Sequence, residues 1–239
     1  MVEKMSEKIA CKNCQSTSYW KNGMKKDKQR YKCKDCGYQF TNTPPRGKPE
    51  KLKEIAVTLY VYCGISMLKI GKMCGVSDVS VLNWIKKAGE KAPPLNPKSD
   101  SGIVILDEMW HFENGKSNKI WLWRAIDGKT RRPLAWELGD RSLETVKKLV
   151  AKVDDGKCDF VTDEYPGFFA ILPEDRHYYG KDLTFPIEQS NSDIRHWLSR
   201  FIRRSKSTTR SVSVLAACIS LMHAVQETGI FHNILSFLT

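Results

Sequence analysis

Four cysteines near the start of the chain have the spacing of a metal site. Two Cys-x-x-Cys pairs, Cys11/Cys14 and Cys33/Cys36, are separated by 18 residues. Each pair can place two thiolates on one ion, and four thiolates in a tetrahedron are typical of structural zinc. A redox pair is disfavoured, because the pairs are matched and no thioredoxin-like βαβ pattern surrounds them. With two strands expected between the pairs, we predict a zinc ribbon over residues 8–43.

Three carboxylates later in the chain have positions that suit metal-dependent chemistry. Asp107 interrupts an apolar strand, Asp163 ends another, and Glu188 opens a helix predicted to run to Arg203. Carboxylates at strand ends and at a helix start can converge on one side of a sheet. A charge inside an apolar strand is costly unless it is paired or binds metal. Two divalent ions held there could activate water or a 3′-hydroxyl, and magnesium suits oxygen ligands.

The residues alone leave two alternatives open. Each acid also fits a structural role, because aspartate at strand ends and glutamate at helix starts are common. Glu108 competes with Asp107, since alternation along a strand puts the two on opposite faces and does not say which face holds a site.

Composition and charge limit the classes of protein to which the chain can belong. Its 239 residues, 41% of them hydrophobic, suffice for one full domain plus small modules and exclude a disordered chain. A polar start and the lack of a long apolar run disfavour a signal peptide or a membrane span, so we expect a cytoplasmic protein.

The net charge of +12 is unevenly distributed. Residues 1–100 hold 20 Lys/Arg against 9 Asp/Glu, residues 101–194 hold 13 against 17, and residues 195–239 hold 6 against 1. Basic ends suit a polyanion such as DNA, and an acidic middle suits divalent cations. Lysines that only keep the chain soluble are the alternative.

Residues 48–91 have the pattern of three short helices. A helix over about 52–60 and another over 66–73 precede a turn, after which Ser77 can cap a third helix that ends in Lys86-Lys87. This pattern indicates a helix-turn-helix DNA-binding module, with a plain three-helix packing unit as the alternative.

A proline-rich linker, residues 92–100, separates this module from a region with the period of strands. Over residues 101–239 the order βββαβ followed by late helices predicts an α/β catalytic domain of RNase H-like fold. The strands are expected at 103–112, 120–126, 133–138, 160–163 and 176–180, and the helices at 142–153, 188–203 and 211–226.

Three segments resemble the insertion-sequence-one (InsAB-type) transposases. That family has a DEMW strand, a TDGWP-like strand end and an IERxN helix, followed by Arg-Lys-Ser. The corresponding segments here are Leu106–Trp110, Val161–Pro166 and Ile187–Asn191, with Arg203–Ser207 as the last element. They occur in order at family-like spacing, and the similarity runs from the zinc ribbon to near the C-terminus.

The resemblance implies that Asp107, Asp163 and Glu188 are the DDE metal ligands. The chain departs from the family pattern at Glu164-Tyr165, where Gly-Trp is usual, and at Gln189-Ser190, where Arg-His is usual. These departures flank the acids without replacing them, so they concern the geometry of the site more than its chemistry.

The implied function is that of an insertion-sequence transposase. Zinc would be structural and magnesium or manganese catalytic. The enzyme would bind terminal inverted repeats of double-stranded DNA, expose 3′-hydroxyls and join them to target DNA as a homo-oligomer. Residues expected to bind DNA phosphates, unless they form a merely solvated basic face, are Lys86, Lys87, Arg195, Arg200, Arg203, Arg204 and Lys206.

Two rival functions remain. One is a zinc-ribbon/helix-turn-helix regulator with an inactive RNase H-like domain. The other is an RNase H-like nuclease that acts on RNA or on a hybrid.

Overall fold

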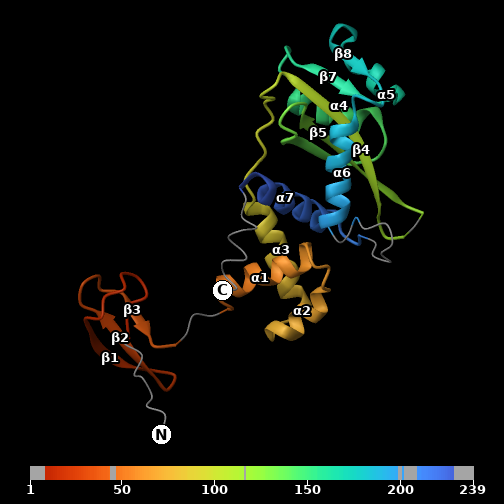
Figure 1. Cartoon of the computed structure of the whole chain (residues 1–239). Coiled ribbons are helices and arrows are strands. Elements are labelled where there is room, and N and C mark those ends of the chain that lie inside the picture. The colour runs from red at the N-terminus through yellow and green to blue at the C-terminus, as the bar shows by residue number, and fades with distance from the viewer. Residues whose placement is uncertain (1–8, 44–46, 116, 199–200, 202–208, 229–239) are drawn as a thin grey trace. The chain divides into compact units, whose positions relative to one another are not determined.

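The computed structural model is a mixed α/β protein with two compact units, Met1–Lys48 and Pro49–Thr239 (Figure 1). Among the helices that it describes, we find none with the length and apolar character needed to cross a membrane. The described residues are 9–43, 47–115, 117–198, 201 and 209–228.

The N-terminal unit is a three-stranded antiparallel sheet. Its strands β1 (Tyr19–Lys25), β2 (Lys28–Cys33) and β3 (Gln39–Thr41) are neighbours in that order. The turn between β1 and β2 consists of Lys26 and Asp27, which both have positive φ (49° and 60°). Two such residues give a tight turn the twist that a hairpin needs. The buried core of the sheet is Cys11, Tyr31, Cys33 and Phe40.

The second unit begins with three helices, α1 (Glu50–Val61), α2 (Met67–Cys74) and α3 (Asp78–Lys91). The predicted cap of the third helix is confirmed, because the Ser77 hydroxyl accepts a hydrogen bond from the Ser80 N–H at 3.2 Å. Such a cap satisfies an N–H that has no partner within the helix. The third helix therefore begins where its local sequence signal places it.

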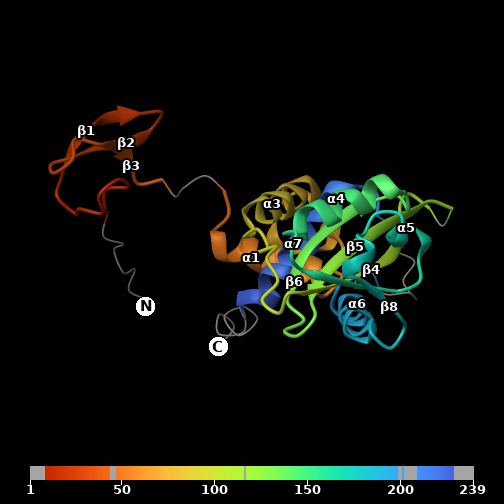
Figure 2. The same cartoon turned by 90° about the horizontal axis from the view of Figure 1, so that it is seen from above.

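These helices share a hydrophobic core with a later helix, α7 (Val212–Thr228). α3 packs against α7, as both views show (Figures 1 and 2). The two helices approach closely at Gly89, where a Cβ would overlap Ala217. Buried residues of α1, α2, α3 and α7 thus belong to the same cluster as Met109 of the large sheet.

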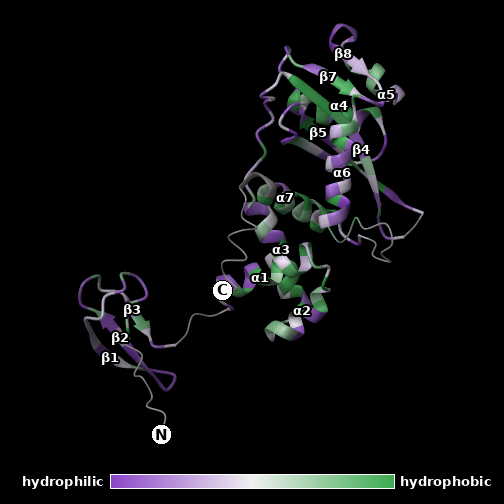
Figure 3. Cartoon of the chain, viewed as in Figure 1, coloured by the Kyte–Doolittle hydropathy of each residue, from purple (hydrophilic) through white to green (hydrophobic). Residues whose placement is uncertain are grey.

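That sheet has five strands in the order β6-β5-β4-β7-β8. Its antiparallel part is β4 (Ile103–Phe112), β5 (Lys119–Asp127) and β6 (Pro133–Gly139). β7 (Asp159–Thr162) pairs parallel to β4, and β8 (His177–Tyr179) pairs parallel to β7. The predicted order of three strands, a helix and a further strand is confirmed, as is the short fifth strand. Hydrophobic residues are concentrated in the central strands (Figure 3).

The two faces of the sheet are covered by different helices. Val104 and Leu106 face α4 (Leu143–Val153) and share a core with its buried side. Ile105 and Val161 face the opposite side, where they pack with Ile187 of α6 (Phe185–Trp197). The remaining short helices are α5 (Pro166–Phe169) and the 3-10 helix Glu174–Arg176.

The late helix is shorter than predicted. It begins at Phe185, with Pro186 in its first turn, and ends at Trp197 rather than Arg203. Leu198 has extended backbone angles, and its side chain enters the core together with Phe201. These two apolar side chains keep helical spacing after the buried Ile194, so the periodicity predicted a longer helix although the backbone leaves the helix at Leu198.

Candidate functional site

The four cysteines of the N-terminal unit converge on one point. The Sγ atoms of Cys11 and Cys36 are 3.6 Å apart, and those of Cys14 and Cys33 are 3.5 Å apart. All four lie within 4.8 Å of one another. Tetrahedral zinc with Zn–S bonds of about 2.3 Å separates its sulfurs by roughly 3.8 Å, so the cluster fits zinc.

Backbone groups support the thiolate form of Cys36, whereas the pKa of Cys14 is raised to about 12, because the N–H of Ser16, which lowers it, is outweighed by the other three thiols and by burial. The N–H of Tyr38 hydrogen-bonds to Cys36 and, together with the side chain of Asn13, lowers the pKa of that thiol to about 6. A thiolate is the form that binds a metal ion. The predicted ligand set is therefore brought together, in a unit whose hydrophobic core is small.

Two aspartates of the second unit meet on the face of the sheet that α6 covers. Ile105 of β4 pairs with Val161 of β7, so the residues two positions further along, Asp107 and Asp163, lie side by side. Asp163 follows β7 directly, and its Oδ1 accepts a hydrogen bond from the Tyr165 N–H at 3.0 Å. Carboxylate oxygens of Asp107, Glu108 and Asp163 lie within 4.8 Å of one another.

Glu188 approaches the same place from α6 but is not a member of that close group. It lies in the first turn of α6, and its Oε1 accepts a hydrogen bond from Thr184 at 3.4 Å. The negative charge of Glu188 still repels that of Asp107. Burial is the main cause that raises the pKa of Asp107 to about 7, and Glu108, Asp163 and Glu188 add to it. A cation at this point would relieve the repulsion among these acids.

Glu108 points to the opposite side of β4 from Asp107. It forms an ion pair with Arg141 at 2.6 Å, and only 6% of its side chain is exposed. Burial raises the pKa of Glu108, and Arg141 opposes that rise. The Arg141 guanidinium also lies over the rings of Trp121 and Tyr165, at 4.7 and 4.5 Å from their centres. Asp107 therefore shares its face with Glu188, while Glu108 has a cationic partner of its own.

Tyr165, which stands where the family usually has tryptophan, packs among other aromatic side chains. Its ring lies 5.6 Å from those of Trp123 and Phe168. Its hydroxyl donates to the carbonyl of Arg141 at 3.0 Å. A Cβ on Gly167 would overlap the tyrosine ring, so the small residue there makes room for it. Tyr165 thus fills an aromatic pocket directly beside Asp163.

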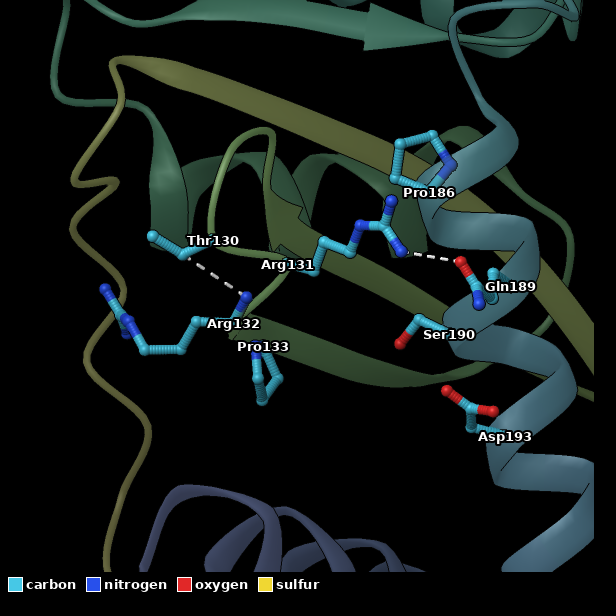
Figure 4. A pocket seen from close by; sticks show the side chains of 8 residues that line it. All are labelled: Thr130, Arg131, Arg132, Pro133, Pro186, Gln189, Ser190 and Asp193. Atoms are coloured by element: carbon cyan, nitrogen blue, oxygen red, sulfur yellow. Dashed lines mark hydrogen bonds between the residues drawn. The ribbon is translucent and has the colours of Figure 1, made fainter.

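The departures at Gln189 and Ser190 are both in contact with arginines. Gln189 accepts from Arg131 at 2.6 Å across a cavity of about 590 Å³ (Figure 4). Ser190 accepts from Arg124 of β5 at 2.9 Å. The acids discussed above are not among the residues that line this cavity. Through these hydrogen bonds the two arginines connect α6 to β5 and to the turn that follows β5.

Sequence reasoning missed Arg124 and Arg141. Arg124 is 1% exposed and stands directly opposite Asp107 in the β4–β5 pairing. The signal that singled out Asp107, a charge inside an apolar run, also applies to Arg124 in Trp-Leu-Trp-Arg-Ala-Ile. No comparable local signal marks Arg141, which follows the sheet in a polar turn.

The residues expected to bind DNA are only partly described. Lys86 and Lys87 lie on α3, where Lys87 is exposed. Arg195 is in the last turn of α6 and half-buried. The remaining four, which lie outside the described residues, are Arg200, Arg203, Arg204 and Lys206.

Known proteins are similar to a large part of the second unit. Residues 102–226 match the IS1 transposase family. The insertion element iso-IS1n protein InsB of Shigella dysenteriae is 34% identical over 113 residues, which cover 47% of this chain and 86% of that protein. The insertion element IS1 9 protein InsB of Escherichia coli K12 is 29% identical over 122 residues, 50% of this chain and 73% of the relative.

One solved structure is also similar to the chain. It is that of a simian T-cell lymphotropic virus intasome in complex with the PP2A regulatory subunit B56 gamma. Its TM-score is 0.35 at 13% identity, and the match covers 68% of this chain and 66% of that one. At this level of likeness we infer nothing from it.

Proposed function

The chain belongs to the IS1 transposase family, and on that premise we propose that it cuts DNA strands and joins them at the acidic site between β4, β7 and α6. The observation that carries the proposal is the convergence of Asp107 and Asp163 with Glu188 close by, on one face of an RNase H-like sheet. Isolated structural acids would have no reason to meet in a half-buried place at the cost of mutual repulsion.

Asp107, Asp163 and Glu188 would hold magnesium or manganese. When bound, two such ions lower the pKa of the attacking hydroxyl and stabilise charge on the leaving oxygen. The chain itself orients the acids through the Tyr165 N–H on Asp163 and the Asn191 amide on Asp107. Glu108 is the alternative metal ligand, because its carboxylate lies in the close group with Asp107 and Asp163. It is ion-paired with Arg141.

The N-terminal elements would bind the ends of the transposon. The side of α3 that carries Val79, Asn83 and Lys87 is exposed, and Lys86 is half-buried beside it. In a helix-turn-helix, residues of the second helix of the motif contact base edges in the major groove. This assignment fits the basic first hundred residues. The zinc ribbon would add phosphate contacts with its own lysines.

A strand-transfer assay tests the proposed function. A pre-cut transposon end is incubated with plasmid and magnesium or manganese, with the wild type, Asp163→Ala and, as a matched control, Glu164→Ala. Glu164 is exposed and adjacent in sequence but is not part of the acidic cluster. We expect joining by the wild type and the control and none by Asp163→Ala.

The other outcomes identify the rivals. Binding of end DNA without joining in any variant indicates a regulator with an inactive domain. Cleavage of RNA or of a hybrid in preference to DNA indicates an RNase H-like nuclease. Joining that survives Asp163→Ala shows that the wrong acid has been chosen.

We also propose that the protein acts as a homo-oligomer on double-stranded DNA. Joining two transposon ends to one target requires two active sites in one complex. Size-exclusion chromatography with light scattering on end DNA measures the stoichiometry. One protein per duplex at every concentration contradicts the oligomer.

A further inference from the structure

We propose that Arg124 is a positioning residue for the acidic site, and that it acts through Asn191 to hold the Asp107 carboxylate in the orientation that binds metal. The proposal rests on the proposed function, because it assumes that Asp107 is a metal ligand. Arg124 itself is separated from the reacting atoms by Asn191.

Three side chains form a continuous chain of hydrogen bonds from β5 through α6 to β4. Arg124 donates from one guanidinium nitrogen to Asn191 Oδ1 at 2.6 Å and from the other to Ser190 Oγ at 2.9 Å. Asn191 donates from Nδ2 to Asp107 Oδ2 at 2.7 Å. Arg124 and Asn191 are 1% and 2% exposed, so water does not compete for these contacts.

The arginine determines which way the Asn191 amide points. A guanidinium carries only donors, so the carbonyl oxygen of Asn191 must face it. The amide nitrogen is then directed at Asp107, where it can only donate. If residue 124 could accept a hydrogen bond, the amide could turn over and place its oxygen against the carboxylate. Arg124 therefore fixes both the position and the polarity of the group that contacts Asp107.

The burial of Arg124 is difficult to explain by stability alone. Moving a charged side chain into the interior costs several kcal/mol unless opposite charge compensates for it. Its hydrogen-bond acceptors, Asn191 and Ser190, are neutral, and the compensating charges are those of Asp107 and Asp193. An apolar residue would fill this place in the strand at lower cost. A cation beneath a cluster of acids instead reduces their repulsion and keeps them together.

A second arginine, Arg131 in the turn between β5 and β6, contacts the same helix α6 and supplies a matched comparison. Arg131 donates to the amide oxygen of Gln189 at 2.6 Å, but this contact is exposed and leads to none of the acids (Figure 4). Gln189 and Asn191 are two positions apart on α6. Loss of the Gln189 contact therefore tests attachment of the helix, whereas loss of the Asn191 contact tests the orientation of Asp107.

The test measures manganese binding by the full-length, zinc-loaded protein without DNA, from the electron paramagnetic resonance signal of free Mn²⁺. The variants are Asn191→Leu, Arg124→Met, Arg124→Lys, the control Gln189→Met and the reference Asp163→Ala. Removing a group that orients a metal ligand typically weakens affinity by roughly 10–100-fold. We expect such a loss for Asn191→Leu and Arg124→Met, partial recovery for Arg124→Lys, and near wild-type affinity for Gln189→Met.

Each failure points to a different step. If the wild type does not bind Mn²⁺, or Asp163→Ala binds it equally well, the metal site of the proposed function is wrong. If Asp163→Ala loses binding while folded Asn191→Leu retains wild-type affinity, only the positioning role is wrong. Circular dichroism checks folding. If Arg124→Met does not fold, Asn191→Leu and Arg124→Lys decide the outcome.

Discussion

Replacing Asp127 by asparagine is expected to destabilise the second unit by about 2–6 kcal/mol, because its buried carboxylate gathers donors from two separate segments. Asp127 ends β5 and is fully buried. Its Oδ2 faces the segment that leads into β4, and its Oδ1 faces the turn into β6. The donors, at 2.7–3.0 Å, are the Ser99, Ser101 and Thr130 hydroxyls and the N–H groups of Asp100, Ser101, Lys129 and Thr130.

The magnitude follows from the donors that would lose their acceptor. Asparagine keeps one carbonyl oxygen and turns the other oxygen into an NH₂ group. Whichever way the amide is placed, it faces two backbone N–H groups that cannot reverse their polarity, while the hydroxyls can rotate and accept. Each buried donor without a partner costs about 1–3 kcal/mol. Two of them amount to a large part of a typical total stability of about 5–15 kcal/mol.

Urea denaturation at pH 7, followed by tryptophan fluorescence, measures this change. The control is Asp155→Asn, since Asp155 accepts from the Lys157 and Cys158 N–H groups at 2.9 Å each but is exposed. Water can replace those bonds, so we expect little change in the unfolding midpoint. If Asp127→Asn unfolds at the same urea concentration as the control, the reasoning about buried acceptors is refuted.

The same residue predicts a pH dependence. Burial alone would raise the pKa of Asp127, but the hydrogen bonds, led by that from Ser99, lower it well below its ordinary value. A carboxyl whose pKa is lower in the folded than in the unfolded protein contributes its full stability above its unfolded-state pKa, about 3.9 for aspartate. That contribution is lost as the pH falls towards and through the folded-state pKa. The difference in stability between wild type and Asp127→Asn should therefore shrink from pH 5 to pH 3. A constant difference contradicts the assignment.

Three further predictions concern other parts of the chain. Removing zinc, or introducing Cys36→Ser, should abolish amide-exchange protection in residues 9–43, because the small core of the ribbon depends on the metal. Protection of residues 49–228 should remain, and retained protection of the ribbon contradicts the prediction. Gly89→Val should destabilise the second unit by roughly 1–3 kcal/mol in urea, since a Cβ overlaps Ala217; an unchanged midpoint would show that α3 does not pack on α7 as described. Replacing Lys86 and Lys87 together by alanine should weaken binding to end DNA and reduce the slope of log K against log salt by about 1–2 units; an unchanged slope removes both lysines from the interface.

Much of the organisation could be predicted from the sequence, because the responsible interactions are local. The two Cys-x-x-Cys pairs predicted a four-cysteine cluster through spacing alone, and the structure brings their sulfurs together as zinc would require. Ser77 caps its helix through an N–H three residues away. The order of strands and helices follows from apolar periodicity, which each segment carries by itself. The same periodicity placed the end of α6 too late, because Leu198 and Phe201 keep helical spacing after Ile194 although the backbone has left the helix at Leu198.

Only the tertiary structure decided which acids share a face and what holds them there. Alternation places Asp107 and Glu108 on opposite sides of β4, and the two sides are equivalent until a helix covers one of them. Packing of Ile187 onto Ile105 makes the side of Asp107 the one that meets α6. The partner of Arg124 lies 67 residues further along the chain. Contacts across such separations depend on how whole elements pack, and local residue patterns carry no information about that packing.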